Sequence, residues 1–329
     1  MNRERVQRAV SVVVAVSITG GLLYLISRHV DLGAAIGQWR DARPLPALGV
    51  FALLFLEGFV LDGLKVYLVL RWKGIRVPYR AVVLMKMASA VFHAGLPMKI
   101  GSATEAVYLS RVYGCRLEHA ISAVSLNLLV NFMALTTVAT ASTALVSVGS
   151  EGLLGFPIWF WSAVGLCGLA GMLVPFVPAG LRLLEAAVGL LPPRAAEIGH
   201  GLLEGFRGLT TAQKLTLMGI ALGMQACLCA LFQLGFASFG LAPPFGYVAI
   251  VSPIIFFLGA IPVTVSGFGT REWLLVFFFT RHRALMTPEQ AVGTGLLFGI
   301  AYAIFMVLLS TPTLPGYLHR IARGGAPRG

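Results

Sequence analysis

Long hydrophobic runs separated by short polar segments give the first picture of this 329-residue chain. Apolar stretches long enough to cross a membrane occupy residues 9–27, 47–70, 120–147, 156–178, 215–239 and 289–311. Because a crossing helix needs about 20 predominantly apolar residues, each stretch predicts one transmembrane helix. The strict alternation typical of transmembrane β-strands is absent. The sequence therefore predicts an all-α polytopic membrane protein with about six transmembrane helices.

Two further apolar segments, residues 81–113 and 247–280, are interrupted by proline and glycine. The second belongs to a run from Leu215 to Thr270 without a charged residue, which is far longer than one crossing. The chain must break within this run, and Pro262 allows the break because proline removes a backbone donor. Irregular backbone is not tolerated facing lipid, so such breaks must be buried in protein or line a wet cavity. Both segments are predicted to be re-entrant helical hairpins.

The charge distribution predicts the orientation in the membrane. The chain is 57% hydrophobic, 12% charged and carries a net charge of +12, which in a soluble protein would suggest a nucleic-acid partner. If both hairpins enter and leave on one side, 16 Lys and Arg residues fall within 1–8, 71–80, 111–119, 177–214 and 313–329. Only 5 fall within the opposite segments 28–46, 148–157, 240–246 and 281–287. The positive-inside rule then predicts cytoplasmic termini and no nucleic-acid partner.

Two smaller features refine this topology. No clear small-residue cleavage site follows residues 9–27, so we interpret them as a transmembrane helix rather than a cleaved signal. The mixed stretch 181–214 is amphipathic and predicts a cytoplasmic loop with an interfacial helix.

The predicted elements repeat. The order helix, helix, broken hairpin, helix in residues 1–148 recurs in residues 149–329, entering from the opposite side. Leu96-Pro97 followed by Gly101 and Glu105 is similar to Ile261-Pro262 followed by Gly267, Gly269 and Glu272. Inverted repeats with broken helices meeting near the midplane are a transporter architecture. We therefore expect a single membrane domain built from two inverted repeats.

The two breaks carry the candidate substrate site. Half-helices that begin after Gly101 and Gly269 would present unpaired amide N–H groups, which attract anions such as phosphate. Lys99 and Arg271 would add positive charge. The glutamates nearby would hold these cations or take up protons during transport. In the alternative interpretation, Lys99–Glu105 and Arg271–Glu272 are structural ion pairs. The predicted substrate-binding residues are Lys99, Gly101, Glu105, Gly267, Gly269, Arg271 and Glu272.

Other polar residues lie within the predicted helices. Asp62 and Lys65 are three apart and can pair on one helix face, although Lys65 is also expected to snorkel towards the cytoplasmic surface. Glu57, Asp62 and His93 are candidates for a proton or coupling role. Asn127 and Asn131, four apart on one helix, predict inter-helix hydrogen bonds.

No catalytic constellation stands out. We find no Ser/His/Asp set, no His/Cys cluster with metal-ligand spacing and no nucleotide-binding glycine loop. The four cysteines lie in or beside apolar runs and form no disulfide framework. The sequence thus predicts a protein that is not an enzyme and needs neither a cofactor nor a metal.

At the two breaks the chain resembles the lysylphosphatidylglycerol synthase transmembrane-region family of flippase-like membrane proteins. The segment from Ile261 to Glu272 is similar to the family's pattern of a proline, paired glycines and then Glu near the C-terminus. The segment from Leu96 to Glu105 is similar to its Pro-x-Arg/Lys-x-Gly pattern. Ser102 stands where many members have Glu, and Glu105 where many have a basic residue.

The resemblance implies a bacterial inner-membrane protein that moves lipid between leaflets. In the best-known members this region is fused to a soluble aminoacyl-transferase domain, which we expect this chain to lack because it ends soon after the last predicted helix. We expect the substrate to be an anionic or zwitterionic phospholipid, a glycolipid or a polyprenyl-phosphate carrier. Two alternatives are a membrane-embedded transferase acting on a lipid-linked substrate and a non-transporting subunit of a cell-envelope assembly complex. As for protein partners, the sequence is compatible with a homo-oligomer and with a partner in envelope biogenesis.

Overall fold

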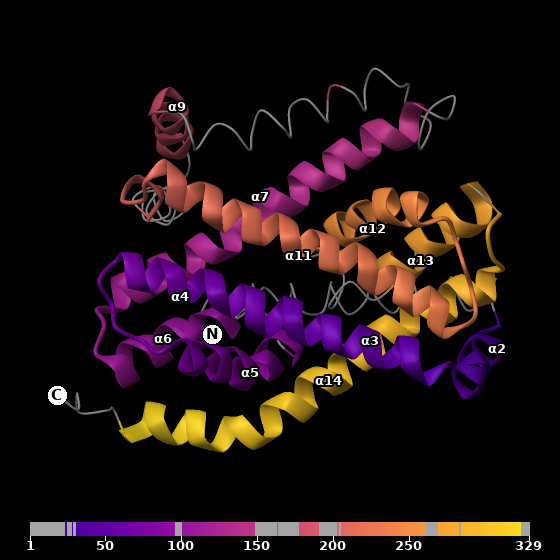
Figure 1. Cartoon of the computed structure of the whole chain (residues 1–329), viewed down its shortest axis with the longest axis horizontal. Coiled ribbons are helices and arrows are strands. Elements are labelled where there is room, and N and C mark those ends of the chain that lie inside the picture. Colours follow the sequence, from indigo (N-terminus) through magenta and orange to yellow (C-terminus); the bar gives the residue numbers. More distant parts are fainter. Residues whose placement is uncertain are drawn as a thin grey trace, which may run out of the picture.

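A computed structural model of the chain describes residues 31–95, 101–148, 178–190, 205–260, 269–282 and 284–323, together with Tyr24, Arg28, Ala163 and Leu203. Throughout these ranges the regular elements are helices (Figure 1). The prediction of an all-α protein is therefore confirmed for the described residues. The predicted crossings at 9–27 and 156–178 lie outside them, apart from isolated positions.

Four helices are long and apolar enough to cross a membrane, and they match four of the predicted crossings. The first, Pro44–Trp72, is continuous through α3 (Pro44–Phe55), the π-helix η2 (Leu56–Leu61) and α4 (Asp62–Trp72). The other three are α7 (Leu117–Val148), α11 (Thr211–Ser238) and α14 (Pro288–Arg323). At about 1.5 Å per residue, the 28 residues of α11 extend about 42 Å, more than the hydrocarbon core requires. The chain is a multi-pass membrane protein.

Two pairs of shorter helices lie between the long ones. The first is α5 (Tyr79–Gly95) with α6 (Gly101–Tyr113), and the second is α12 (Phe245–Ala260) with α13 (Thr270–Val276), which continues as the π-helix η6 (Phe277–His282). The helices within each pair contact each other. Their outer limits agree within two residues with the predicted broken segments 81–113 and 247–280.

The two pairs occupy opposite ends of the long axis (Figure 1). The chain passes from α4 to α5 through residues 73–78 and from α6 to α7 through residues 114–116 at one end. At the other end it passes from α11 to α12 and from η6 to α14. The order of a long helix, two short helices and a long helix thus occurs twice along the chain.

Apolar packing joins these elements through two main clusters. One unites α4, α5, α6 and α7, and the other unites α3, α12 and α13. Helices α11 and α14 contribute to both clusters, so they connect the two ends of the molecule. A Cβ added to Gly235 in α11 would lie 2.0 Å from Cζ of Phe298 in α14. Such close approach at small residues is how helices associate in lipid.

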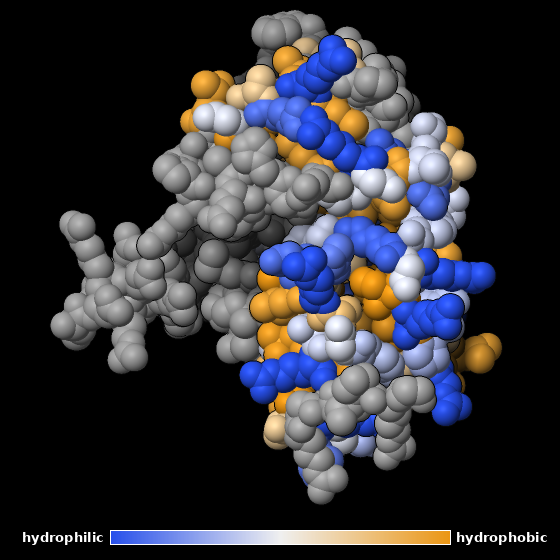
Figure 2. Space-filling model, turned by 90° about the vertical axis from the view of Figure 1, so that its left-hand side faces the viewer, coloured by the Kyte–Doolittle hydropathy of each residue, from blue (hydrophilic) through white to orange (hydrophobic). Residues whose placement is uncertain are grey.

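Hydrophilic side chains gather on the end where α4, α6 and α14 terminate (Figure 2). Exposed arginines of this end are Arg71, Arg76, Arg80, Arg111, Arg116 and Arg320. The amphipathic helix α9 (Pro178–Gly189) lies at the same end, whereas α2 (Leu32–Gly37) and the 3-10 helix η1 (Gln38–Asp41) lie at the other. The folded chain therefore brings together several of the basic segments that the sequence assigned to one side.

Candidate functional site

The first half of the molecule contains a buried cluster of charges that begins at the π-helix η2. This wide turn interrupts a membrane-spanning helix immediately before Asp62. The Tyr79 hydroxyl, from the start of α5, donates a hydrogen bond to the Val60 carbonyl in η2 at 2.8 Å. Within α4, the Lys65 ammonium lies 3.3 Å from Oδ1 of Asp62, as their spacing predicted. π-Helical turns inside α-helices occur frequently at functional sites.

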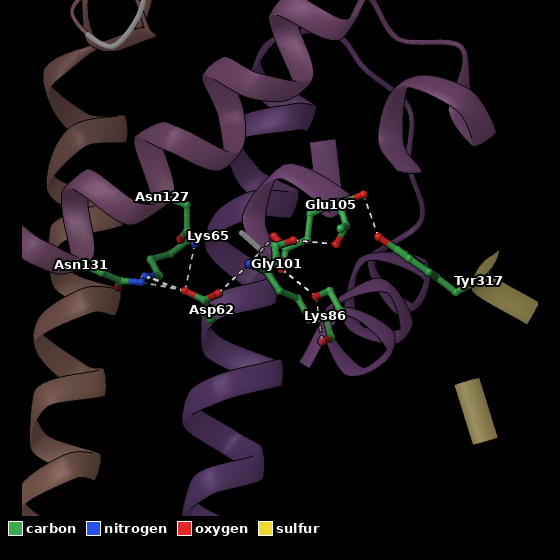
Figure 3. Close-up of polar contacts among 10 residues, drawn as sticks. Asp62, Lys65, Lys86, Gly101, Glu105, Asn127, Asn131 and Tyr317 are labelled. Carbon is green, nitrogen blue, oxygen red and sulfur yellow. Dashed lines mark hydrogen bonds and ion pairs between the residues drawn. The ribbon is translucent and has the colours of Figure 1, made fainter. Parts of the chain in front are cut away.

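Lys86 of α5 connects three helices (Figure 3). Its Nζ lies 2.8 Å from Oδ2 of Asp62 in α4 and 2.7 Å from Oε2 of Glu105 in α6. Lys86 is 6% exposed and Glu105 is fully buried. Ser89, one turn further along α5, donates its hydroxyl hydrogen to Oε1 of Glu105 at 2.8 Å. Both carboxylate oxygens of Glu105 therefore have partners on α5.

Helix α7 closes the other side of the cluster with two asparagines. The Nδ2 groups of Asn127 and Asn131 donate to Oδ1 of Asp62 at 3.0 and 2.8 Å, which confirms the predicted inter-helix hydrogen bonds. Asn131 also accepts a hydrogen bond from the Lys65 ammonium through Oδ1. Lys65 is 0% exposed. The expectation that it snorkels is therefore wrong, because its ammonium turns inward to partners on α4 and α7.

The four charges that the printed ion pairs of this cluster join, all among the described residues, balance. Asp62 and Glu105 contribute two carboxylates, and Lys65 and Lys86 contribute two ammonium groups. An isolated charge at membrane depth is costly, so ionisable residues there pair with one another and mark functional sites. Removing one partner of a buried ion pair leaves an uncompensated charge and costs about 3–5 kcal/mol. The four charges therefore form one interdependent unit.

The beginning of α6 is held by contacts from α14. Gly101 is buried and is the first residue of α6, and its carbonyl accepts a hydrogen bond from the Thr104 hydroxyl at 2.7 Å. Tyr317 of α14 donates its hydroxyl hydrogen to the Thr104 carbonyl at 2.7 Å. Its ring stacks on that of Tyr108, with centroids 4.6 Å apart. Helix α14 thus fixes the first turn of the helix that carries Glu105.

The second half of the molecule contains a smaller charged pair at the start of α13. Gly269 has φ of 86°, a conformation that requires glycine. Its backbone N–H donates to Oε2 of Glu272 at 2.6 Å. The Arg271 guanidinium donates to Oε1 of Glu272 through Nε at 3.2 Å and Nη2 at 2.8 Å. The side chain of Glu272 therefore caps its own helix and pairs with its neighbour while fully buried.

The structure places the predicted residues as follows. Asp62 and Glu105 lie in one cluster, while Gly269, Arg271 and Glu272 form the other. Glu57 lies in η2, half-buried and within electrostatic reach of Lys65. His93 lies on α5, with its side chain outside the described part, and Lys99 and Gly267 lie outside the described residues altogether.

One of the two ion pairs of the alternative interpretation lies among the described residues. Arg271 and Glu272 pair as their adjacency indicated. Glu105 is bound by Lys86 and Ser89, and Lys99, its partner in that interpretation, lies outside the described residues. Sequence reasoning missed Lys86, although a lysine in the middle of an otherwise apolar helix was a signal for it. No group of three His, Cys, Asp or Glu side chains among the described residues is arranged to hold a metal ion.

Comparison with known proteins identifies a family whose model matches most of the chain. The model of the Lysylphosphatidylglycerol synthase TM region matches residues 11–310. No curated protein matches the chain.

Proposed function

Because the chain belongs to the lysylphosphatidylglycerol synthase transmembrane-region family, we propose that it is a flippase-like lipid transporter. It moves an anionic or zwitterionic phospholipid, a glycolipid or a polyprenyl-phosphate carrier between the leaflets of the bacterial cytoplasmic membrane. One observation carries the proposal. In each pair of short helices, the second helix holds a fully buried glutamate bound to a cation, Glu105 with Lys86 and Glu272 with Arg271.

The placement of the short helices supports two re-entrant hairpins. The 13 residues of α6 extend about 20 Å, less than the roughly 30 Å of a hydrocarbon core. The two pairs lie at opposite ends of the long axis, and each is flanked by long helices that end or begin at the same end (Figure 1). This arrangement supports inverted repeats within residues 1–148 and 149–329, and a substrate path between the two breaks.

The charged pairs provide a way to receive a headgroup. Lys86 and Arg271 are already oriented by carboxylates, so a lipid phosphate can replace a carboxylate oxygen as their partner. An exchange of partners keeps each cation paired, and the displaced glutamate takes up a proton, so neither group is left as an isolated charge at membrane depth. The acyl chains would stay in the surrounding lipid. The chemistry involves no covalent step, and we propose that the protein is not an enzyme.

The orientation follows from the charge distribution. The arginine-rich end formed by the termini of α4 and α6 (Figure 2) would face the cytoplasm under the positive-inside rule. Helix α14 ends there, which supports a cytoplasmic C-terminus. The pair α5–α6 would then enter from the cytoplasm, and the pair α12–α13 from the opposite side.

The test is leaflet exchange of fluorescent phospholipids in proteoliposomes, with several phosphate-bearing headgroups and with an imposed proton gradient. Lys86→Met/Glu105→Gln removes one buried cation and one buried carboxylate together, so the remaining Asp62 and Lys65 still balance. We expect wild type to exchange lipid and this double variant to lose exchange. Arg76→Met, which removes an exposed cation, is the matched control and should behave as wild type.

Two outcomes decide against transport. If folded wild type exchanges no phosphate-bearing lipid under any gradient, the transporter proposal fails. If mass spectrometry of the recovered lipids instead reveals a covalently altered species, the transferase alternative replaces it. Exchange that survives in the double variant would refute the assignment of the site to Lys86 and Glu105.

A further inference from the structure

Helix α14 passes both charged pairs on one face. Near its beginning, Gly295 lies against Glu272, since an added Cβ would be 3.0 Å from Cγ of that glutamate. Near its end, Tyr317 bonds the Thr104 carbonyl in the first turn of α6. Ser310 lies between them and contacts α5. At 3.6 residues per turn, Gly295 and Ser310 point within about 60° of one another.

Ser310 bonds two backbone groups of α5. Its Oγ accepts a hydrogen bond from the Val91 N–H at 3.1 Å and donates one to the Met87 carbonyl at 2.8 Å. These two groups are the donor and acceptor of a single i to i−4 bond of α5. Lys86 and Ser89, which bind Glu105, belong to the same turn.

Ser310 has two mutually exclusive acceptors. Its hydroxyl lies 2.8 Å from the Met87 carbonyl of α5 and 2.7 Å from the Met306 carbonyl of α14 itself. A hydroxyl has one hydrogen, so it can be donated fully to only one carbonyl at a time. Ser310 is 1% exposed, so bulk water does not compete for these bonds. A movement of α14 relative to α5 therefore changes which of the two carbonyls receives this hydrogen.

We propose that Ser310 is a positioning residue for the Lys86–Glu105 pair, and that through it α14 couples the two glutamate–cation pairs. In the observed arrangement, Ser310 holds the turn of α5 from which Lys86 reaches both Asp62 and Glu105. A shift of α14 withdraws the Ser310 hydroxyl from the Val91 N–H and the Met87 carbonyl and leaves it to the Met306 carbonyl of its own helix, which releases this turn. Because Gly295 packs on Glu272, a change at the second pair displaces the same helix. The role in transport rests on the proposed function, whereas the coupling contact does not.

The experiment compares Ser310→Ala with Thr311→Ala in the full-length protein. Thr311 is exposed, and its hydroxyl donates to the Val307 carbonyl of its own helix at 2.8 Å. Thr311→Ala therefore removes a neighbouring hydroxyl whose hydrogen bond stays within α14. Two quantities are measured, namely hydrogen exchange of the α5 amides by mass spectrometry and fluorescent-lipid exchange in proteoliposomes. Inter-helix hydrogen bonds in membranes have modest strength, so Ser310→Ala should accelerate amide exchange near Val91 about threefold. It should also slow lipid exchange, and Thr311→Ala should change neither.

A third variant separates positioning from general stability. Ser310→Ala is added to Lys86→Met/Glu105→Gln, in which the pair is already absent. If Ser310 acts through that pair, Ser310→Ala lowers the free energy of unfolding less in the Lys86→Met/Glu105→Gln background than in wild type. Full additivity would overturn the proposal, as would unchanged α5 amide exchange in Ser310→Ala. Faster α5 exchange in a protein whose wild type moves no lipid would support the coupling contact and refute the transport function.

Discussion

The buried charge cluster makes a quantitative prediction about stability. Lys86→Met keeps the length of the side chain and removes the ammonium that lies 2.8 Å from Asp62 and 2.7 Å from Glu105. Asp62 retains Lys65 and two asparagine donors, but Glu105 loses the ammonium group that lies 2.7 Å from its Oε2. The substitution therefore removes one of two buried ammonium groups while both buried carboxylates remain.

The magnitude follows from this loss of compensation. Breaking a buried pair by removing one partner costs about 3–5 kcal/mol, whereas replacing both partners by neutral groups is often close to neutral. We expect Lys86→Met to cost about 3–5 kcal/mol, and Glu105→Gln to cost less because Lys86 keeps Asp62. Lys86→Met/Glu105→Gln should be more stable than Lys86→Met alone. The coupling energy between the two sites should reach about 2–3 kcal/mol.

The assay is the free energy of unfolding in detergent micelles, measured for wild type, both single variants and the double variant. The exposed ion pair Arg207–Glu185 supplies a control cycle, with side chains 50% and 29% exposed. Solvent screens such pairs, so the coupling between Arg207→Met and Glu185→Gln should be about 0–1 kcal/mol. If the costs of Lys86→Met and Glu105→Gln simply add, or couple no more strongly than the control pair, the reasoning about a charge-balanced cluster is wrong.

Three further predictions concern packing, backbone conformation and pH. Gly235→Ala should cost at least about 1–3 kcal/mol of unfolding free energy, because its Cβ would meet Phe298 at 2.0 Å. Gly223→Ala is the control because nothing lies within 4 Å of the added Cβ, and it should stabilise the protein by less than about 1 kcal/mol. Gly269→Ala should cost about 1–2 kcal/mol in the same assay because φ is 86°, and an unaltered stability would contradict the cap geometry. Burial raises the pKa of the Cys115 thiol, and only the thiolate reacts with maleimide. A variant retaining only Cys115 should therefore label slowly at pH 7 and reach its half-maximal rate at a higher pH than free cysteine, and an equal midpoint would refute the shift.

The sequence by itself determined those features that depend on neighbours along the chain. Hydropathy located four long helices, since crossing a membrane depends on the composition of one continuous segment. The Asp62–Lys65 contact followed from a spacing of three on a helix. The Arg271–Glu272 pair followed from adjacency, although the bond from the Gly269 N–H to Glu272 also needed the backbone conformation at that glycine.

The tertiary structure decided which helix faces meet, and this changed the interpretation of the site. Lys86 reaches carboxylates that lie 24 and 19 positions away on two other helices, so no local spacing could reveal the pairing. Lys65 turns inward because Asn131, on α7, offers an acceptor there. Ser310 reaches α5 across more than two hundred residues of chain. Hydrophobicity and helical period restrict each helix to a length and a polar face, whereas the partner of a buried polar group depends on how separate helices pack. In this protein the sequence therefore located the helices and some of the charged residues, and the packing of α4, α5, α6 and α7 determined that the charges form one balanced cluster.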